Sequence, residues 1–580
     1  MAVEKLIVDH IDTWTTALQT RSTAGRGSSG KIDLYGIKKL RELILELAVR
    51  GKLVPQDPND EPASVLLERI AAEKAELVKQ GKIKKQKPLP EISEEEKPFE
   101  LPAGWEWVRL GTLFNSIQSG GTPSKINPAF WGGDIPWASV KDLGSSQYIS
   151  KTQDYITEAG LLSGSKLADS GDVLICTRMG LGKIAIASCP IAFNQDLKAV
   201  KLTSHIIPNF FFNTYSTVKI KGTGTTVEGI KQEQLVNYIT GFPPFNEQNK
   251  IVVKVKELMS LCDQLEQHTL TSLDAHQQLV ETLLTTLTDS QNADELAENW
   301  ARISKHFDTL FTTEASIDAL KQTILQLAVM GKLVPQDPND EPASELLKRI
   351  AQEKAQLVKD GKIKKQKPLP PVNDEDKLFE IPFNWEHVYL NDICEVITDG
   401  THQTPKYTDR GRPFISAQCV KPFKFMPENC RYVSEEDYQQ YIKNRTPEIN
   451  DILLARVGAG IGECAVIDVN LEFSIYVSTA LIKPIKCHIN SNYLCLWLNS
   501  PIGRLFSSRY TYGKGVSQGN LNLSLIRTFV ISIPPYKEQN LIVEKVRTYL
   551  SICEKLKSKI QSAQQTQLHL ADALTEAAIN

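Results

Sequence analysis

The sequence has little of what marks a membrane protein, a secreted protein or a metal-binding protein. No apolar run reaches the roughly 18–20 residues that span a bilayer. The first residues, MAVEKLIVDHIDTW, carry acids within their apolar stretch and lack the small-residue cleavage site of a signal peptide. The 10 cysteines are scattered without a Cys-x-x-Cys pair, which predicts reduced thiols in the cytoplasm and neither a disulfide framework nor a metal site.

Signals of catalysis are missing as well. The 9 histidines are dispersed, and the sequence contains no His-Glu-x-x-His or Ser-His-Asp grouping. GLGK at 180–183 lacks the upstream glycine and the following Ser or Thr of a phosphate-binding loop. GAGIG at 458–462 runs directly into the apolar segment CAVIDV, where a dinucleotide-binding loop needs the start of a helix. We therefore interpret it as a glycine turn in a β-hairpin.

Two proline pairs are similar to the Asn/Asp-Pro-Pro-aromatic motif of N6-adenine methyltransferases. They are FPPF at 242–245 and IPPY at 533–536. Their first residues, Phe242 and Ile533, cannot accept a hydrogen bond from an exocyclic amine. We therefore expect no catalytic residue in this chain, and we interpret the prolines as the boundary before a helix.

What the sequence does contain is a long internal repeat. Residues 37–90 and 317–370 align without a gap, with 42 identities in 54 positions. The segment GKLVPQDPNDEPAS is identical in both copies. Helical spacing of apolar residues predicts a helix that ends at the glycine of this segment, Gly51 or Gly331. A second helix should follow, capped by the final serine, Ser64 or Ser344.

A second repeat shows that a unit of roughly 280 residues is duplicated. PPFNEQNKIVVKVKELM at 243–259 resembles PPYKEQNLIVEKVRTYL at 534–550, whereas the segments between the repeated ends diverge. Recent duplication alone would not leave similar ends and dissimilar middles. We therefore favour two sites that read different things on one kind of scaffold.

The two Pro-Pro segments open into helices with a heptad stripe. Apolar residues step by four and three through Ile251, Val255, Leu258 and Cys262, which is typical of a coiled coil. Each helix should run for about 35 residues, on the order of 50 Å. Because a lone heptad helix cannot bury its stripe, each needs a partner. We expect these partners near 37–53 and 317–333. The middles carry short β-rich runs broken by Gly, Asn and Pro, and we predict compact β-rich α+β domains.

Paired Pro-Pro-x-x-Glu-Gln-x-x-Ile-Val helices flanking two unlike domains resemble the DNA-specificity (S) subunit of type I restriction–modification enzymes. The resemblance covers essentially the whole chain. It implies an α+β fold: a tandem pseudo-twofold repeat of two β-rich target recognition domains separated by long antiparallel coiled-coil helices. The implied regions are an N-terminal helical region 1–100, recognition domain 1 at 101–242, a central helical region 243–380, recognition domain 2 at 381–533 and a C-terminal helix 534–580.

The resemblance also implies how such a chain works. Each recognition domain reads one half of a bipartite asymmetric DNA site, while the helices set the spacer and dock two methyltransferase (modification) subunits. The chain itself is then non-catalytic. S-adenosylmethionine, ATP and magnesium belong to partner subunits, and two restriction subunits join the full complex.

Base edges and phosphates are contacted mainly by Arg, Lys, Asn, Gln, Ser, Thr and backbone amides. Polar loop residues of these types, with glycines that allow close backbone approach, are our candidate DNA contacts. In the first domain they are Ser119, Thr122, Lys125, Ser139, Lys141, Thr177, Arg178, Lys183, Lys221, Gly222, Thr223, Gly224 and Thr225. In the second they are Thr401, His402, Lys406, Ser416, Gln418, Arg456, Gly513, Lys514, Gly515, Ser517 and Gln518.

Charge favours a division of labour in DNA binding. The first domain has 12 Lys and Arg against 10 Asp and Glu, and the second has 15 against 14. Such weak positive balance predicts weak DNA binding by the isolated chain, with partners supplying much of the phosphate contact. A stand-alone DNA-binding or scaffold protein without an enzymatic partner is the alternative. An active methyltransferase ranks third, because both Pro-Pro motifs lack the acceptor.

Overall fold

The chain folds into two compact units. The computed structural model describes residues 3–21, 31–144, 146–220, 222, 229–443, 445–512 and 519–579. The first unit holds the described residues up to Thr271 and those from Gln564 onward, and the second runs from Ser272 to Ala563. Within the described ranges, no helix is both long and apolar enough to span a bilayer.

Two long helices begin in one unit and end in the other. Helix α8 (Phe245–Asp289) has 45 residues and α17 (Tyr536–Ile579) has 44. Both are longer than the expected 35 residues, because the polar residues that follow the heptad stripe stay helical. Each helix starts directly after its proline pair, as predicted, and the preceding Phe242 and Ile533 are fully buried in strands.

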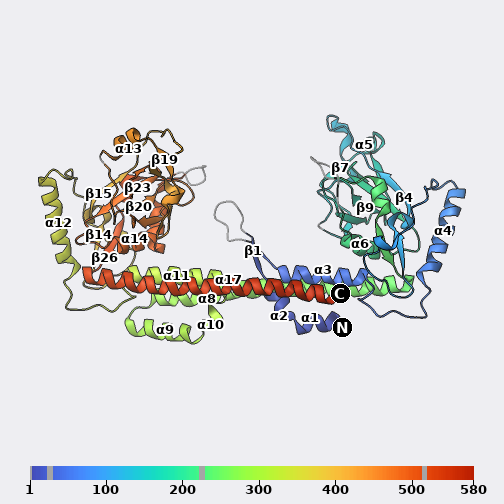
Figure 1. Ribbon diagram of the computed structural model, residues 1–580, viewed down its shortest axis with the longest axis horizontal. Coiled ribbons are helices and arrows are strands. Elements are labelled where there is room, and N and C mark those ends of the chain that lie inside the picture. Colours follow the sequence, from blue (N-terminus) through green and yellow to red (C-terminus); the bar gives the residue numbers. More distant parts are fainter. Residues whose placement is uncertain are drawn as a thin grey trace. The chain divides into compact units, whose positions relative to one another are not determined.

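The first unit combines a helical layer with β-sheets. Its sheets have the strand orders β4-β12-β9-β10-β6, β7-β5-β11-β8, β13-β3 and β1-β2. Helix α6 packs between the strands and α3 (Figure 1). Besides α8 and α17, the helices are α1 (Val3–Asp9), α2 (Ile11–Thr16), α3 (Tyr35–Val49), α4 (Ala63–Lys79), α5 (Glu158–Leu162), α6 (Pro208–Thr217) and α7 (Gln232–Asn237). The strands are β1 (Gln19–Arg21), β2 (Lys31–Asp33), β3 (Glu106–Arg109), β4 (Phe114–Ser119), β5 (Trp131–Ala138), β6 (Tyr148–Ile149), β7 (Asp154–Ile156), β8 (Lys166–Ala168), β9 (Val173–Cys176), β10 (Ile184–Ala187), β11 (Ile191–Phe193), β12 (Leu197–Leu202) and β13 (Ile239–Phe242).

The second unit repeats this plan. Its larger sheets have the orders β15-β23-β20-β21 and β19-β16-β22. Its helices are α9 (Ala293–Lys305), α10 (Phe307–Leu310), α11 (Glu314–Val329), α12 (Ala343–Lys359), α13 (Glu435–Ile442), α14 (Ser491–Asn499), α15 (Pro501–Arg509) and α16 (Leu523–Ile526). The strands are β14 (Glu386–Tyr389), β15 (Cys394–Asp399), β16 (Arg412–Ile415), β17 (Val420–Lys421), β18 (Lys424–Phe425), β19 (Arg431–Val433), β20 (Ile452–Ala455), β21 (Cys464–Val466), β22 (Ser474–Ile475), β23 (Thr479–Pro484), β24 (Thr511–Tyr512), β25 (Asn520–Leu521) and β26 (Val530–Ile533).

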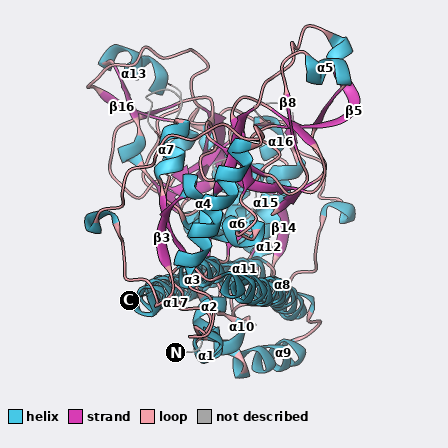
Figure 2. Cartoon of the chain, turned by 90° about the vertical axis from the view of Figure 1, so that its right-hand side faces the viewer, coloured by secondary structure: helices cyan, strands magenta, loops and turns pink. Residues whose placement is uncertain are grey.

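The two dissimilar middles share one plan of strand pairing, with one more strand in each of the two main sheets of the first domain. In both, the main sheet pairs its first strand antiparallel with the strand that precedes a helix: β4 with β12 before α6, and β15 with β23 before α14. In both second sheets, an inner strand, β5 or β16, pairs parallel with one neighbour and antiparallel with the other. GAGIG turns the antiparallel hairpin β20–β21, as predicted, and GLGK turns the equivalent hairpin β9–β10. Figure 2 shows the strands of both domains in magenta.

Salt bridges and hydrogen bonds within the first unit give the helix directions. Arg41 of α3 bonds to Asp263 and Glu266 of α8, 2.6 Å from each carboxylate. Tyr35, at the start of α3, donates to Asp572 of α17 over 2.7 Å, and Lys52, after its end, reaches the Ile579 carbonyl over 2.7 Å. Helix α3 therefore runs alongside both long helices, parallel to α17.

The second unit has the corresponding contacts. Lys321 of α11 lies 2.5 Å from Glu554, and Lys557 lies 2.7 Å from Asp318, so α11 runs antiparallel to α17. Lys332, just after α11, donates to the Thr288 carbonyl at the end of α8 over 2.6 Å. The expected partner helices, near 37–53 and 317–333, are confirmed in their own units.

Helix boundaries follow the glycines but not the serines of the repeat. Helix α3 ends before Gly51 and α11 before Gly331, and both glycines have φ near +70°, at 65° and 72°. The prediction that Ser64 and Ser344 cap the next helices is wrong. Helices α4 and α12 begin at Ala63 and Ala343, whose N–H groups donate to backbone carbonyls of the loop before the first domain strand.

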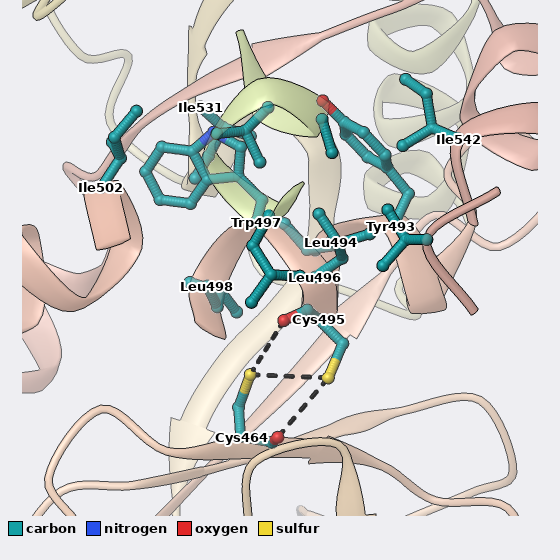
Figure 3. Packing of buried hydrophobic residues seen from close by; sticks show 14 of the residues in the cluster. Cys464, Tyr493, Leu494, Cys495, Leu496, Trp497, Leu498, Ile502, Ile531 and Ile542 are labelled. Atoms are coloured by element: carbon teal, nitrogen blue, oxygen red, sulfur yellow. Dashed lines mark hydrogen bonds between the residues drawn. The ribbon is translucent and has the colours of Figure 1, made fainter. Parts of the chain in front are cut away.

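The core of the second unit joins α14 to the strand that leads into α17. Trp497 and Tyr493 are fully buried there, and both side chains hydrogen-bond to Ser532 of β26, at 3.1 and 2.8 Å. The Ser532 hydroxyl in turn donates to the Val329 carbonyl of α11 over 2.7 Å. Figure 3 shows this cluster, with the free thiols of Cys464 and Cys495 beside it.

Candidate nucleic-acid interface

The Glu-Gln pair of the first Pro-Pro motif holds the first recognition domain on its helix. Glu247 is buried and accepts hydrogen bonds from the Trp105 indole at 2.9 Å and from Gln56 of the repeated segment at 3.1 Å. Gln248 is also buried: its side-chain oxygen accepts from the Ile207 N–H at 3.0 Å, and its amide donates to the His205 carbonyl at 3.2 Å. Burial raises the pKa of Glu247, and the two hydrogen bonds oppose that shift.

The second motif makes the same contacts. Glu538 accepts from Trp385 at 3.0 Å and from Gln336 at 3.1 Å, and burial likewise raises its pKa. Gln539 accepts from the Asn490 N–H at 2.8 Å. We call each set, Gln56–Trp105–Glu247 and Gln336–Trp385–Glu538, a clamp.

The clamps explain much of why the fourteen-residue segment occurs twice. A Cβ atom on Gly51 would lie 2.5 Å from Pro102, and one on Gly331 would lie 2.5 Å from Pro382. Asp60 bonds to Asn246 of α8 at 2.9 Å. In each unit, the segment therefore has to fit between the start of the recognition domain and the first turn of the long helix. These internal contacts explain the identity of the residues that make them without a shared external partner.

Loops gather at the opposite end of β12 from the Gln248 contacts with His205 and Ile207. Because β12 is antiparallel to β4 and to β9, its start meets the ends of both. There Lys198 donates to Ser119 over 2.5 Å, and Thr122 donates to Gln195 over 2.5 Å. Lys183 of the β9–β10 hairpin donates to the Val140 carbonyl over 3.2 Å, which adds the loop of Ser139 and Lys141. Ser119, Thr122, Lys183 and the loop of Ser139 and Lys141 thus lie close together, and we call this set of loops the first loop edge.

The second domain has the same edge, formed by the ends of β15 and β20 and the start of β23. The Thr401 N–H donates to the Ile475 carbonyl at 3.0 Å, and the Ala417 N–H donates to the Ser478 hydroxyl at 3.2 Å. These contacts bring Thr401, Ser416 and the β20–β21 hairpin together. We call this the second loop edge.

Three residues that we predicted to contact DNA are buried and hydrogen-bonded within the second or the first domain. Arg456 has only 6% of its surface exposed. Its guanidinium donates to Asp399, to the Val477 carbonyl at 3.2 Å and to the Leu521 carbonyl at 2.9 Å. Thr177 and Thr401 are buried as well. The Thr177 hydroxyl donates to the Asp196 carbonyl, and the Thr401 hydroxyl accepts from the Gln403 N–H. The structure therefore argues against direct DNA contact by these three, and Arg456 is a positioning residue that ties three loops together.

Other predicted residues remain at the surface of the loop edges. Lys125, Lys141, Arg178, Lys183, Lys406, Gln418 and His402 are exposed, and Ser119 is too. His402 lies 3.2 Å from Asp399, and Gln418 donates to the Asn429 carbonyl at 3.0 Å. Thr122, Ser139, Ser416 and Gly222 are half-buried. Lys221, Thr223, Gly224, Thr225, Gly513, Lys514, Gly515, Ser517 and Gln518 lie outside the described residues.

Sequence reasoning missed several residues of the loop edges. Gly120 and Gly400 occupy equivalent positions. A Cβ atom would lie 2.2 Å from the Asn194 carbonyl oxygen at Gly120 and 2.1 Å from the Ile475 carbonyl oxygen at Gly400. Their repetition at the same point of both copies was the available signal. Met179 is 68% exposed and has φ of 60°, an unfavourable conformation for its side chain. Nothing in the sequence indicated that strain.

Comparison with known proteins identifies the family to which this chain belongs. The model of the family "Type I restriction modification DNA specificity domain" matches residues 102–275 and 382–563. The chain belongs to this family. The specificity subunits of the type I restriction enzymes EcoAI and EcoEI from Escherichia coli are 48% and 47% identical to it, over 100% of each chain. A chain from a solved structure of type I R-M complex assembly is 18% identical, with a TM-score of 0.45, over 83% of this chain and 99% of that one.

These matches decide what kind of protein this is. The predicted family, the α+β tandem fold and the role as a DNA specificity subunit, rather than an enzyme in its own right, are confirmed. As a specificity subunit, the chain works with DNA and with the other subunits of a restriction–modification system.

Proposed function

We propose that each loop edge reads one half of a bipartite, asymmetric DNA site. The observation that carries this is the contrast within the chain: two domains with one plan of strand pairing are held by the same clamp but carry different residues on their loops. Arg178 and Lys141 in the first domain, and Lys406 and Gln418 in the second, are exposed and of the types that contact phosphates and base edges.

The remaining parts of the system are assigned to partners. Two methyltransferase subunits dock on the helical regions, one for each copy of the repeat, and two restriction subunits complete the nuclease. S-adenosylmethionine, ATP and magnesium act in those partners. The long helices α8 and α17 set the spacer between the half-sites. Supporting this, both helices pass from one unit to the other, and at 1.5 Å per residue each is about 65 Å long.

A methylation map tests the reading. The chain is co-expressed with its methyltransferase subunit in a host that lacks adenine methylation, and the modified adenines are sequenced. The expected target has two specific blocks of different sequence separated by an unread gap. A single uninterrupted block, or a palindrome, would contradict the proposal of two different readers.

Stoichiometry tests the docking. Native mass spectrometry of the co-purified methyltransferase complex should give two methyltransferase subunits for each specificity chain. A complex that methylates its target with one methyltransferase subunit per chain would contradict the assignment of one docking site to each repeat.

A further inference from the structure

Three metal-ligating side chains meet at the junction between α12 and the second recognition domain. Glu353 lies on α12, and Cys487 and His488 lie between β23 and α14. The Glu353 carboxylate lies 2.9 Å from the Cys487 sulfur and 3.2 Å from Nε2 of His488. The three ligand atoms all lie within 4.8 Å of one another. Cys487 is exposed and the other two side chains are half-buried, so an ion can reach them from solvent.

The chemistry of the set selects a class of metal. Tetrahedral zinc, with bonds of about 2.0–2.3 Å, places its ligand atoms about 3.3–3.7 Å apart, so small side-chain movements suffice here. A thiolate and an imidazole favour zinc and other divalent transition metals, whereas magnesium and calcium prefer oxygen ligands alone. The carboxylates of Glu353 and Glu395 both act electrostatically on the Cys487 thiol, which adds negative charge around the site.

We propose that Glu353, Cys487 and His488 form a binding site for a zinc-class divalent transition metal, with a fourth position open to water. Binding replaces the hydrogen bond from the thiol to Glu353 by bonds from sulfur, Nε2 and a carboxylate oxygen to the metal. Burial, and then the hydrogen bond to Glu353, raise the pKa of Cys487 to about 11, so the thiol proton is released to solvent when the metal binds.

The first unit supplies an internal reference for this site. The equivalent helix residue, Glu73 of α4, accepts a hydrogen bond from Ser204 at 2.7 Å and lies 3.9 Å from His205. Ser204 and His205 precede α6 just as Cys487 and His488 precede α14. The junction is therefore the same in both units, except that a serine hydroxyl, a poor zinc ligand, stands where the second unit has a thiol. The inference is that only the second junction takes the metal.

The site would fasten α12 to its recognition domain independently of DNA reading. In both units this junction consists of a glutamate from the repeated helix against residues that follow β12 or β23. A metal adds three strong bonds between parts of the chain 134 residues apart. Because the ligands are so far apart in the sequence, the spacing of the cysteines gave no zinc signature. The proposed site contradicts our expectation from the sequence that the chain has no metal site.

The test uses the full-length chain, reduced and stripped with a chelator, and titrated with Co²⁺ as a spectroscopic probe for zinc. One cobalt per chain, with a thiolate-to-cobalt charge-transfer band that Zn²⁺ abolishes, is the expected result. Cys487→Ser, which copies the first unit, should remove the band and weaken zinc binding at least about a hundredfold. Zinc should raise the thermal unfolding midpoint of the unchanged chain but not that of Cys487→Ser.

Matched variants keep the test specific. Cys430→Ser removes another incompletely buried thiol of the second domain and should leave the band intact. Unchanged circular dichroism and an unchanged unfolding midpoint of metal-free Cys487→Ser would show that the variant folds. Absence of the thiolate band from the unchanged chain, or equal zinc affinity in Cys487→Ser, would overturn the proposal. Neither outcome bears on DNA specificity, which the methylation map tests separately.

Discussion

The indole N–H of Trp105 donates a hydrogen bond to the buried carboxylate of Glu247 over 2.9 Å. The two residues are 142 positions apart and lie at the two borders of the first recognition domain. Trp385 and Glu538 form the equivalent pair in the second unit at 3.0 Å. A buried carboxylate with few donors is costly, so each indole stabilises the position of a whole domain on its long helix.

Trp105→Phe should therefore destabilise the first unit. The substitution keeps an aromatic ring but removes the donor, which leaves Glu247 with one hydrogen bond fewer and should cost about 1.5–3 kcal/mol. Urea unfolding followed by circular dichroism measures the change. Trp300→Phe, at a position 44% exposed on α9, is the control and should have little effect. A loss no larger than that of the control would show that the hydrogen bond from Trp105 contributes nothing to stability.

Arg178→Ala should affect DNA recognition and not stability, whereas Arg456→Ala should lower stability. Arg178 is exposed, so its removal should leave stability unchanged and weaken recognition of the first half-site alone. Arg456 is buried against Asp399, and removing it leaves that carboxylate without its main partner, at a cost of about 3–5 kcal/mol. Thermal unfolding and methylation of DNA carrying either half-site altered separate the two effects. Full stability in Arg456→Ala would contradict its positioning role.

The second unit should lose stability as the pH falls below neutral because of His387. Burial, and then the charge of Lys377, lower the pKa of this imidazole from 6.5 to about 4. The unfolded chain takes up the proton below pH 6.5 and the folded chain does not. The stabilising contribution is therefore complete above about pH 6.5 and is lost between about 6.5 and 4, at up to about 1.4 kcal/mol per pH unit.

His387→Trp checks the source of this pH dependence. Trp107 occupies the equivalent place in the first unit, where it packs against Phe99 with ring centroids 5.0 Å apart, as His387 packs against Phe379 at 5.7 Å. Free energies of unfolding measured across this range should fall less steeply for the variant. Parallel curves for the two proteins would exclude His387 as the cause.

A change in helix length should alter the gap of the DNA target and not its bases. Inserting one helical turn, about four residues, into residues 251–285 of α8, with a matching insertion in α17, should lengthen the gap by about one or two base pairs. Methylation mapping reports both quantities at once. Altered half-sites with an unaltered gap would contradict the spacer role of the helices.

Features set by local pattern could be predicted from the sequence. The heptad stripe beginning at Ile251, the proline boundaries before both long helices and the helix ends at Gly51 and Gly331 depend on neighbours along the chain, and the structure confirms them. The duplication also predicted that both halves would have the same arrangement of helices and recognition domain. The caps at Ser64 and Ser344 failed because a distant backbone carbonyl, not a side chain, satisfies the start of each helix.

Features set by distant contacts were not accessible from the sequence. Arg456 looked like a DNA contact because it is an arginine beside a glycine turn, but Asp399 and two carbonyls from other loops surround its guanidinium. Arg178, at the corresponding turn, stays exposed. Thr177, not Arg178, makes the backbone hydrogen bonds that correspond to those of Arg456, so Arg178 lies one residue further from its strand. Because successive side chains of an extended segment point to opposite faces, that offset separates the buried arginine from the exposed one.

The position of the Gln248 contacts on the first domain has an evolutionary consequence. Gln248 bonds to the His205 carbonyl beyond the end of β12, whereas the first loop edge surrounds the start of that strand. Substitutions in the loops therefore leave the anchoring contacts untouched. A lineage can acquire a new target sequence by drift at exposed loop positions such as Lys141 and Arg178 without weakening these anchoring contacts.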